Sequence, residues 1–240
     1  MHQVFSDFLP AIGETLRLGG DERHYLGRAL RARAGEQVRV ADGKGHAVVA
    51  VLRGFEGDDA LLEVESQADD HVEPWHLHLA LCPPRGDAFD MTLEAAVQLG
   101  LESLILTRSQ RVMANFDGGA LQPERLERRL LEACRQCERS AVPPVSGPFE
   151  LLDYLKEPQP GALRLVASER GGAPLAEALK GVAAGAVIHA VVGPEGGFTA
   201  AELQAAVDAG WVPVTLGPRP LKVPVAVSAL MAGLRTLQPR

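Results

Sequence analysis

Cysteine is scarce in this chain, which holds three among 240 residues. Cys82, Cys134 and Cys137 are an odd number and too few for a disulfide framework. The Cys134-x-x-Cys137 spacing falls inside a helical pattern, not at the strand-to-helix turn that redox motifs occupy. We therefore expect buried free thiols, which pack as small hydrophobic side chains, and no metal site.

Long apolar runs and a secretory leader are also missing. No stretch approaches the length of a membrane span, and Met1 to Ala11 has neither the basic start nor the continuous apolar stretch of a signal peptide. With 46% hydrophobic and 23% charged residues, the composition is typical of a globular protein with a substantial core. We expect one large domain or two small ones, a cytoplasmic location and no membrane partner.

Two nucleotide-binding signatures are absent as well. Nothing resembles the Lys-Ser/Thr ending of a phosphate-binding P-loop, and there is no Gly-x-Gly-x-x-Gly fingerprint. A nucleoside triphosphatase is therefore disfavoured. The net charge of −7 argues against a protein that coats nucleic acid indiscriminately.

One short segment nevertheless carries local positive charge. Between positions 23 and 44 there are six basic residues and only two acidic ones, Glu36 and Asp42. The basic residues are Arg23, Arg28, Arg31, Arg33, Arg39 and Lys44. This excess in an acidic chain indicates a limited patch that contacts phosphates, although a solvated arginine-rich turn would give the same pattern.

The sequence pattern changes at Ser66 to Pro74, a polar and acidic stretch that is the best candidate for a linker. Before it, short apolar segments separated by turns predict a small antiparallel β unit, with Asp42-Gly43 as a strong hairpin signal. A short helix is expected from His24 to Arg33. The predicted strands cover residues 15–18, 37–40, 47–52 and 60–64.

After Pro74, strands alternate with helices, which implies a mostly parallel sheet covered by helices. The predicted strands cover residues 75–82, 103–106, 163–168, 186–192 and 212–216, and the predicted helices 89–99, 123–137, 175–179, 200–209 and 225–237. His189 falls inside an apolar strand, where a hydrogen-bonded core histidine is expected.

The most informative stretch is Val191 to Thr199, with the sequence VVGPEGGFT. An apolar strand stops at three glycines and a proline, as a buried strand does when it reaches a loop. Glycine has no Cβ, so backbone can lie against a ligand there. Thr199 and Glu202 form a capping-box pattern, so a helix should begin directly after the loop. A tight connection serving only the fold is the alternative.

A second strand-to-loop break follows at Val212 to Arg219, before the last predicted helix. In open α/β sheets, ligands bind outside the carboxyl ends of the strands. Because Gly197 and Gly217 both follow such ends, we expect the two loops to meet around a binding site.

These residues give the chain its resemblance to a known family, the ribosomal RNA small subunit methyltransferase E family. It belongs to the SPOUT class of knotted RNA methyltransferases that use S-adenosylmethionine. The resemblance covers nearly the whole chain and rests on four blocks in the family's order. They are His24 to Arg31, Glu132 to Arg139 with Pro143 behind it, Gly193 to Phe198, and Leu216 to Arg219.

The resemblance implies a fold and an activity. Residues 73–240 would form an α/β SPOUT domain, trefoil-knotted, with a mostly parallel sheet and helices on both faces. Residues 1–72 would form a PUA-like β-barrel that binds RNA. The protein would be a homodimer that uses S-adenosyl-L-methionine to methylate N3 of a specific uridine in 16S ribosomal RNA, free or within the small ribosomal subunit. The knot follows from the resemblance alone, because threaded chains are rare.

The resemblance also implies roles for individual residues. The cofactor-binding residues would be Gly193, Pro194, Gly196, Gly197, Leu216, Gly217 and Leu221. The RNA-binding residues would be Arg23, Arg28, Arg31, Arg33, Lys44 and Arg139, the last reaching RNA or the partner subunit.

Two residues are catalytic candidates. Arg219 would stabilise the uridine oxygen or a neighbouring phosphate, because a guanidinium offers forked donors and stays charged, with a structural salt bridge as the competing role. Glu195 would face the sulfonium or assist proton removal, and a solvent-exposed turn carboxylate is the alternative reading.

The chain departs from the family pattern before its last helix. Relatives usually carry Thr-Glu-Thr-Ala there, whereas this chain has Val223-Pro224-Val225-Ala226 and lacks the acidic residue. Alternatives therefore stay open: a divergent RNA-binding relative with weak or no methyl transfer, and a methyltransferase acting on a different RNA. A nucleotide-binding α/β enzyme unrelated to methylation is a third.

Overall fold

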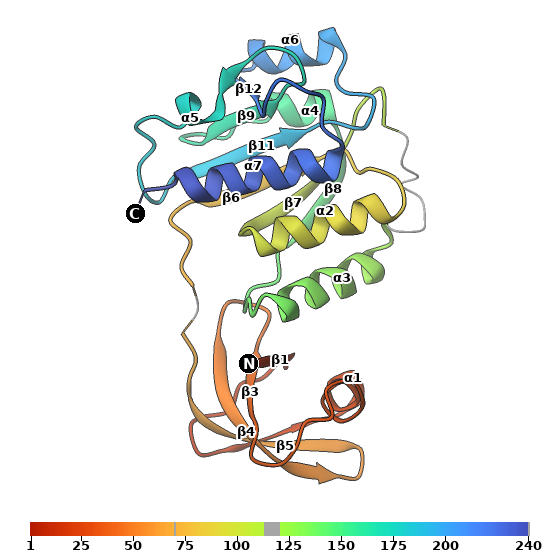
Figure 1. Cartoon of the computed structure of the whole chain (residues 1–240), viewed down its shortest axis with the longest axis vertical. Helices are drawn as coiled ribbons and strands as arrows, with labels where there is room; N and C mark the ends of the chain where they lie inside the picture. Colours follow the sequence, from red (N-terminus) through yellow and green to blue (C-terminus); the bar gives the residue numbers. More distant parts are fainter. Residues whose placement is uncertain (70, 113–120, 240) are drawn as a thin grey trace. The chain divides into compact units, whose positions relative to one another are not determined.

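The structure, a computed structural model, describes residues 1–69, 71–112 and 121–239 and contains two compact units (Figure 1). The first unit comprises Met1–Val72 and Leu131–Val142, and the second Glu73–Leu130 and Pro143–Arg240. The predicted linker, Ser66 to Pro74, includes residue 70, which lies outside the described residues.

A five-stranded sheet forms the first unit, in the order β1-β3-β4-β5-β2. Its strands are β1 (His2–Phe5), β2 (Thr15–Leu18), β3 (Gln37–Ala41), β4 (Ala47–Glu56) and β5 (Asp59–Gln67). The four predicted strands, β2 to β5, pair antiparallel as expected, whereas the fifth strand, β1, pairs parallel with β3, with His2 opposite Val38. Local patterns did not predict β1, since its partner is distant in the sequence and no hairpin turn joins the two.

The hairpin between β3 and β4 forms where Asp42-Gly43 predicted it. The Asp42 carboxylate accepts hydrogen bonds from the backbone amides of Lys44 at 2.7 Å and His46 at 3.0 Å. Gly43 has φ +73°, a conformation that suits glycine. The apolar side chains of these strands, Val38, Val40, Val48 and Leu52 among them, are buried in the core of the unit.

The predicted helix of the first unit differs in its limits. It begins at Gly20 as α1 (Gly20–His24) and continues as a π-helical segment, η1 (Tyr25–Ala29). It does not reach Arg33, because Arg31 adopts φ +54°, a left-handed conformation that ends a right-handed helix.

Residues 131–142, which include the end of α3 (Pro123–Gln136), pack within the first unit. The Gln3 amide donates to the Arg139 carbonyl at 2.8 Å, and the Val142 amide donates to the Gly43 carbonyl at 2.9 Å. The buried Arg39 guanidinium donates to the Ser140 hydroxyl at 2.7 Å. A segment distant in the sequence therefore completes this unit.

The second unit is built on a seven-stranded sheet in the order β10-β12-β9-β11-β6-β7-β8. Its strands are β6 (His76–Leu81), β7 (Leu101–Arg108), β8 (Val145–Glu150), β9 (Leu163–Ala167), β10 (Ala173–Pro174), β11 (Val187–Val192) and β12 (Val212–Thr215). Every pairing among these strands is parallel, so the predicted parallel sheet is confirmed.

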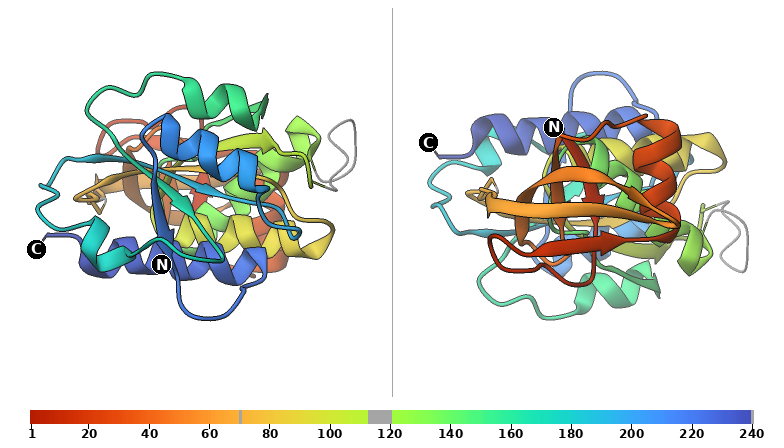
Figure 2. Two further views of the ribbon diagram at one scale, coloured as in Figure 1. Left: turned by 90° about the horizontal axis from the view of Figure 1, so that it is seen from above. Right: turned by 90° about the horizontal axis from the view of Figure 1, so that it is seen from below.

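Helices cover both faces of this sheet, as expected (Figure 2). They are α2 (Asp87–Gln98), α4 (Leu151–Lys156), α5 (Leu175–Ala178), α6 (Ala200–Asp208) and α7 (Val223–Leu237). α2 packs against α7, and α4 packs against α6. On the side of α4 and α6, Tyr154, Leu155 and Trp211 bury Val166 and Val191 of the sheet. In the described part of the chain, no helix is long and apolar enough to cross a membrane.

Candidate functional site

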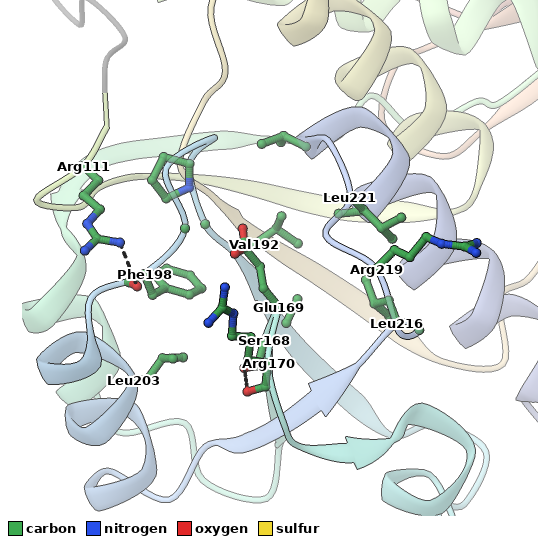
Figure 3. Close-up of a pocket in the computed structure, with 17 residues that line it drawn as sticks. Arg111, Ser168, Glu169, Arg170, Val192, Phe198, Leu203, Leu216, Arg219 and Leu221 are labelled. Atoms are coloured by element: carbon green, nitrogen blue, oxygen red, sulfur yellow. Dashed lines mark hydrogen bonds between the residues drawn. The ribbon is translucent and has the colours of Figure 1, made fainter.

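A cavity of about 290 Å³ lies within the second unit, where β9, β11 and β12 end (Figure 3). Three loops line it, one after each of these strands, together with the first turn of α7 and the side chains of Arg111 and Leu203. Its volume is near the lower end of the range for small-molecule sites, about 300–1,000 Å³. The two glycine loops therefore do meet, as their places at strand ends predicted.

The loop after β11 depends on glycine at two positions for different reasons. Gly197 has φ +65°, and its amide donates to the Pro194 carbonyl at 2.9 Å, which closes a tight turn. At Gly193 an added Cβ would lie 3.0 Å from the Phe198 ring, so the ring packs directly on the backbone. Gly193, Pro194, Gly197 and Phe198 all line the cavity.

The N-terminus of α6 anchors this loop. The predicted capping box is confirmed: the Glu202 amide donates to the Thr199 hydroxyl at 3.2 Å, and the Thr199 amide donates to the Glu202 carboxylate at 2.7 Å. The buried Glu202 carboxylate also accepts from the Gln110 amide at 2.9 Å. α6 is thus connected to the segment that carries Arg111.

Arg111 was not predicted from the sequence, although it lines the cavity. Its guanidinium donates to the Gly196 carbonyl at 3.0 Å, and an added Cβ on Gly196 would lie 3.3 Å from the Arg111 side chain. Gly196 therefore does not line the cavity but leaves room for the arginine that holds the loop.

The loop after β12 contributes Leu216, Gly217, Arg219 and Leu221 to the lining. The Thr215 hydroxyl donates to the Gly217 carbonyl at 3.1 Å, and Gly217 has φ +135°. α7 begins with Lys222 as its N-cap and has Pro224 in its first turn, where proline is tolerated. Val223 and Ala226 of this turn also line the cavity.

A third loop, after β9, adds Ser168, Glu169 and Arg170. The sequence identified this strand but assigned no site residue to the loop, because Ser168 to Arg170 follow the strand before its two glycines, Gly171 and Gly172, and belong to no family block. The Ser168 hydroxyl donates to the Arg170 carbonyl at 2.9 Å and the Ser168 amide to the Val214 carbonyl at 2.9 Å. The rule that ligands bind at the carboxyl ends of parallel strands was the signal that would have found it.

The two catalytic candidates lie at the edge of the cavity. Arg219 lines it, but Figure 3 shows its guanidinium directed away from the centre. Glu195 is exposed and does not contribute to the lining, because its carboxylate accepts a hydrogen bond from the Arg85 amide at 3.0 Å. The charged side chains in the lining are Arg111, Glu169, Arg170 and Arg219.

Cysteine and histidine have structural roles near this site. Cys82 is buried and free, 3.3 Å from the Thr107 hydroxyl, and burial raises the pKa of its thiol to about 11. His189 stacks on His78 with ring centres 4.7 Å apart, and the Tyr154 hydroxyl lies 3.0 Å from its Nδ1 atom. Burial, with the positive charges of His78 and Arg164, lowers the pKa of His189 to about 4. Among the described residues, no group of acidic, histidine or cysteine side chains is arranged to hold a metal ion.

All the predicted RNA-binding residues lie in the first unit. Arg28, Arg31, Arg33 and Lys44 are exposed, whereas Arg23 is half-buried over the Phe55 ring. Arg139 belongs to residues 131–142, and this segment is bridged to the β3–β4 turn through Ala141 and Lys44. The structure thus brings the segment of Arg139 beside the turn of Lys44.

Comparison with protein families covers both units. Residues 71–235 match the family described as RNA methyltransferase domain, and residues 18–65 match the RNA methyltransferase PUA domain. The first match spans more than half of the chain and includes all three loops of the cavity. The second confirms that the first unit is PUA-like.

Individual relatives agree with these matches. The chain is 32% identical to the ribosomal RNA small subunit methyltransferase E of a Synechocystis species, over 94% of this chain and 74% of that protein. The Mycobacterium bovis relative of that name is 29% identical over 98% of this chain and 92% of its own. A crystal structure of the Neisseria gonorrhoeae protein of the same name, bound to S-adenosyl methionine, is 30% identical with a TM-score of 0.89, covering 99% of this chain and 98% of that one. This chain therefore belongs to the ribosomal RNA small subunit methyltransferase E family.

Proposed function

We propose that this protein is a methyltransferase that uses S-adenosyl-L-methionine to methylate ribosomal RNA of the small subunit. The observation that carries the proposal is the cavity in which two glycine loops converge at the strand ends, in a chain of this family. The Neisseria gonorrhoeae relative, similar over nearly the whole chain, binds S-adenosyl methionine.

The residues of the cavity fit this cofactor. Gly193, Pro194 and Gly197 line the cavity, so the backbone groups of their loop lie where they can contact the adenine and ribose at close range. Leu216 and Leu221 supply apolar surface from the loop after β12, which also contributes the Gly217 backbone, and Pro194 lines the cavity from the loop after β11. When bound, S-adenosylmethionine supplies an electrophilic methyl group on its sulfonium.

The finer proposal is methyl transfer to N3 of a uridine in 16S ribosomal RNA. The imide proton on this atom would pass to water, which leaves negative charge on N3 and the uracil oxygens. The N3–methyl bond would then form as the sulfur–methyl bond breaks, with S-adenosylhomocysteine as the leaving group. The outward-directed Arg219 guanidinium at the rim is suited to stabilise that charge or a neighbouring phosphate. Holding both reactants in attack geometry contributes on the order of 7–11 kcal/mol to lowering the barrier. The Glu195 carboxylate, which accepts from the Arg85 amide, positions the loop in this scheme.

The first unit would bind the RNA through Arg23, Arg28, Arg31, Arg33, Lys44 and Arg139. In the described part of the chain, Arg28, Arg31 and Arg33 form no ion pair, so their charge is available to phosphates. We propose PUA-like and methyltransferase domains at residues 1–72 and 73–240, a trefoil knot in the second, and a homodimer. Exposed apolar side chains on the paired helices α2 and α7, Met91 and Val225, support a contact between two copies.

A second candidate is a relative with weak or no methyl transfer. It is favoured by the first turn of α7. Val223 and Ala226 of this turn line the cavity, and Pro224 stands where the family pattern has a glutamate. The decisive experiment compares small-subunit RNA from cells with and without the protein, mapping methylated bases. Loss of one N3-methyluridine supports the main proposal, and purified protein should restore it. If the methylation pattern is unchanged and purified protein transfers no methyl group, the weak relative is the correct reading.

A further inference from the structure

Two oppositely charged side chains follow each other in the loop after β9 and both line the cavity. Glu169 and Arg170 come directly after Ser168, whose hydroxyl and amide hydrogen bonds fix the course of the loop. Figure 3 shows the Glu169 carboxylate and the Arg170 guanidinium directed into the cavity, in contrast to Arg219.

Neither group is paired with another part of the chain that the structure describes. Within residues 1–69, 71–112 and 121–239, the Glu169 carboxylate and the Arg170 guanidinium have no hydrogen-bond or ion-pair partner. The Arg111 guanidinium differs, because it is occupied by the Gly196 carbonyl. Charges that face a cavity without a partner are available to a ligand that carries complementary charges.

The position of Glu169 is also tied to the glycine loop. A Cβ added to Gly197 would lie 3.0 Å from a Glu169 carboxylate oxygen, a tight contact that would require the carboxylate to move by a few tenths of an ångström. The absence of a side chain at position 197 therefore leaves the space in which the carboxylate lies. Gly197 therefore has two roles: it adopts the positive φ of the turn, and it leaves room for the Glu169 carboxylate.

The proposed cofactor has two chemically different ends. Its adenosine is neutral and matches the backbone groups and apolar surface of the glycine loops. Its amino-acid end carries an α-carboxylate and an α-ammonium group, next to the sulfonium. A guanidinium binds a carboxylate through two parallel hydrogen bonds, and a carboxylate attracts either cation.

We propose that Glu169 and Arg170 bind the amino-acid end of the cofactor, Arg170 holding its carboxylate and Glu169 its positive charge. The proposal rests on the proposed function, since it assumes that the cavity takes S-adenosylmethionine. The two residues then determine specificity. They distinguish this cofactor from compounds that have the same adenosine but no charged amino-acid end.

Calorimetry on the purified full chain tests the assignment with three ligands. S-adenosylmethionine has all three charges, S-adenosylhomocysteine lacks the sulfonium charge, and 5′-methylthioadenosine lacks the amino-acid end altogether. The variants are Arg170→Met and Glu169→Gln. Matched controls are Arg125→Met and Glu157→Gln, exposed residues of the same unit outside the cavity lining.

We expect Arg170→Met to weaken S-adenosylhomocysteine binding about tenfold, in the range for a charge-assisted hydrogen bond in a partly exposed site, and to leave methylthioadenosine within about twofold of wild type. Glu169→Gln should weaken S-adenosylmethionine binding by a similar factor. An equal loss for S-adenosylhomocysteine identifies the ammonium as the partner of Glu169, and no loss identifies the sulfonium.

Retained methylthioadenosine binding shows that a variant is folded with its adenosine site intact. The proposal is overturned if both variants bind all ligands as the controls do, or if methylthioadenosine binding falls as much as the others. Failure of the proposed function is a separate outcome, in which the wild-type chain binds none of the three ligands.

Discussion

At the scale of single residues, Gly197 is held by two separate constraints. Its φ of +65° lies in the left-handed region, and its missing Cβ leaves room for the Glu169 carboxylate. Gly181 has a similar φ of +78° with nothing within 4 Å of an added Cβ. Alanine substitutions at Gly197 and Gly181 therefore share the strain of a positive φ, but only the substitution at Gly197 also adds a methyl group beside the Glu169 carboxylate.

We expect Gly197→Ala and Gly181→Ala each to lower the free energy of unfolding by about 1–2 kcal/mol, because an L-residue is strained at positive φ. Gly197→Ala alone should also weaken S-adenosylhomocysteine binding, by about tenfold or more. Urea unfolding and calorimetry measure the two effects. Equal affinity of both variants for the ligand would show that the contact with Glu169 has no part in binding.

His189 gives a prediction about pH. Its pKa in the folded protein is about 4, whereas an unperturbed histidine titrates near pH 6.5. Below about pH 6.5 the unfolded chain therefore binds a proton that the folded chain refuses, so stability falls as the pH drops towards about 4, and above this window the effect vanishes.

Allowing for partial exposure, we expect His189 to account for a loss of about 1 kcal/mol between pH 7.5 and pH 5. His189→Gln should reduce the pH dependence of the urea midpoint by that amount. His46→Gln, at an exposed turn, is the control because His46 makes no contact with this core. A His189→Gln variant with the full pH dependence of wild type would contradict the assignment.

How far the site was predictable depends on what each residue's role requires. Gly193, Gly197 and Gly217 were found because an abrupt change from apolar strand to glycine is visible in the sequence. Glu169 and Arg170 were missed because the direction of their side chains depends on how β9 pairs with β11 and β12, which no local pattern records.

At the scale of elements, local signals predicted well and distant pairings did not. The α6 capping box was predicted because Thr199 and Glu202 are only three positions apart. β1 was missed because its pairing with β3 is formed across the sequence, and β8 because Gly147 and Pro148 interrupt an exposed strand that has no apolar alternation. The alternation of the longer strands and helices sufficed for the parallel sheet.

The capping box predicts a loss of stability on Thr199→Ala. Removing the hydroxyl leaves the Glu202 amide without its partner, so the free energy of unfolding should fall by about 1 kcal/mol. Thr199→Ser keeps the hydroxyl and should be nearly neutral. Thr236→Ala, in the last turns of α7, controls for loss of threonine in a helix. If the three variants unfold at the same urea concentration, the cap makes no net contribution.

Arg39 joins elements within the first unit. Its guanidinium donates to the Gln3 side chain at 3.0 Å, the Asp69 carbonyl at 2.9 Å and the Ser140 hydroxyl at 2.7 Å. We expect Arg39→Met to lower the free energy of unfolding by about 2–4 kcal/mol, because buried acceptors lose a charged donor. The Val142 amide, bonded to Gly43, should then exchange faster with solvent, and unchanged exchange would contradict a role in holding residues 131–142.

At the scale of the whole molecule, the net charge of −7 and the exposed arginines of the first unit act in opposite directions on RNA. An acidic chain repels a polyanion at long range, so binding must come from a limited patch whose charges are not already neutralised. Arg17 and Arg53 belong to the same unit but form ion pairs with Glu56 at 3.2 Å and Glu63 at 2.8 Å.

This contrast predicts the salt dependence of RNA binding. Replacing Arg28, Arg31 and Arg33 with glutamine should lower the slope of log affinity against log salt by about 2, since each phosphate contact to single-stranded RNA contributes roughly 0.7. Replacing Arg17 and Arg53 should change the slope little, because their charge is already paired.

Affinity for S-adenosylhomocysteine should stay unchanged in both variants, because the cavity lies wholly in the second unit. Filter binding to small-subunit RNA over a range of salt concentrations measures the slopes, and an equal change in both variants would mean that RNA responds to overall charge and not to a defined patch.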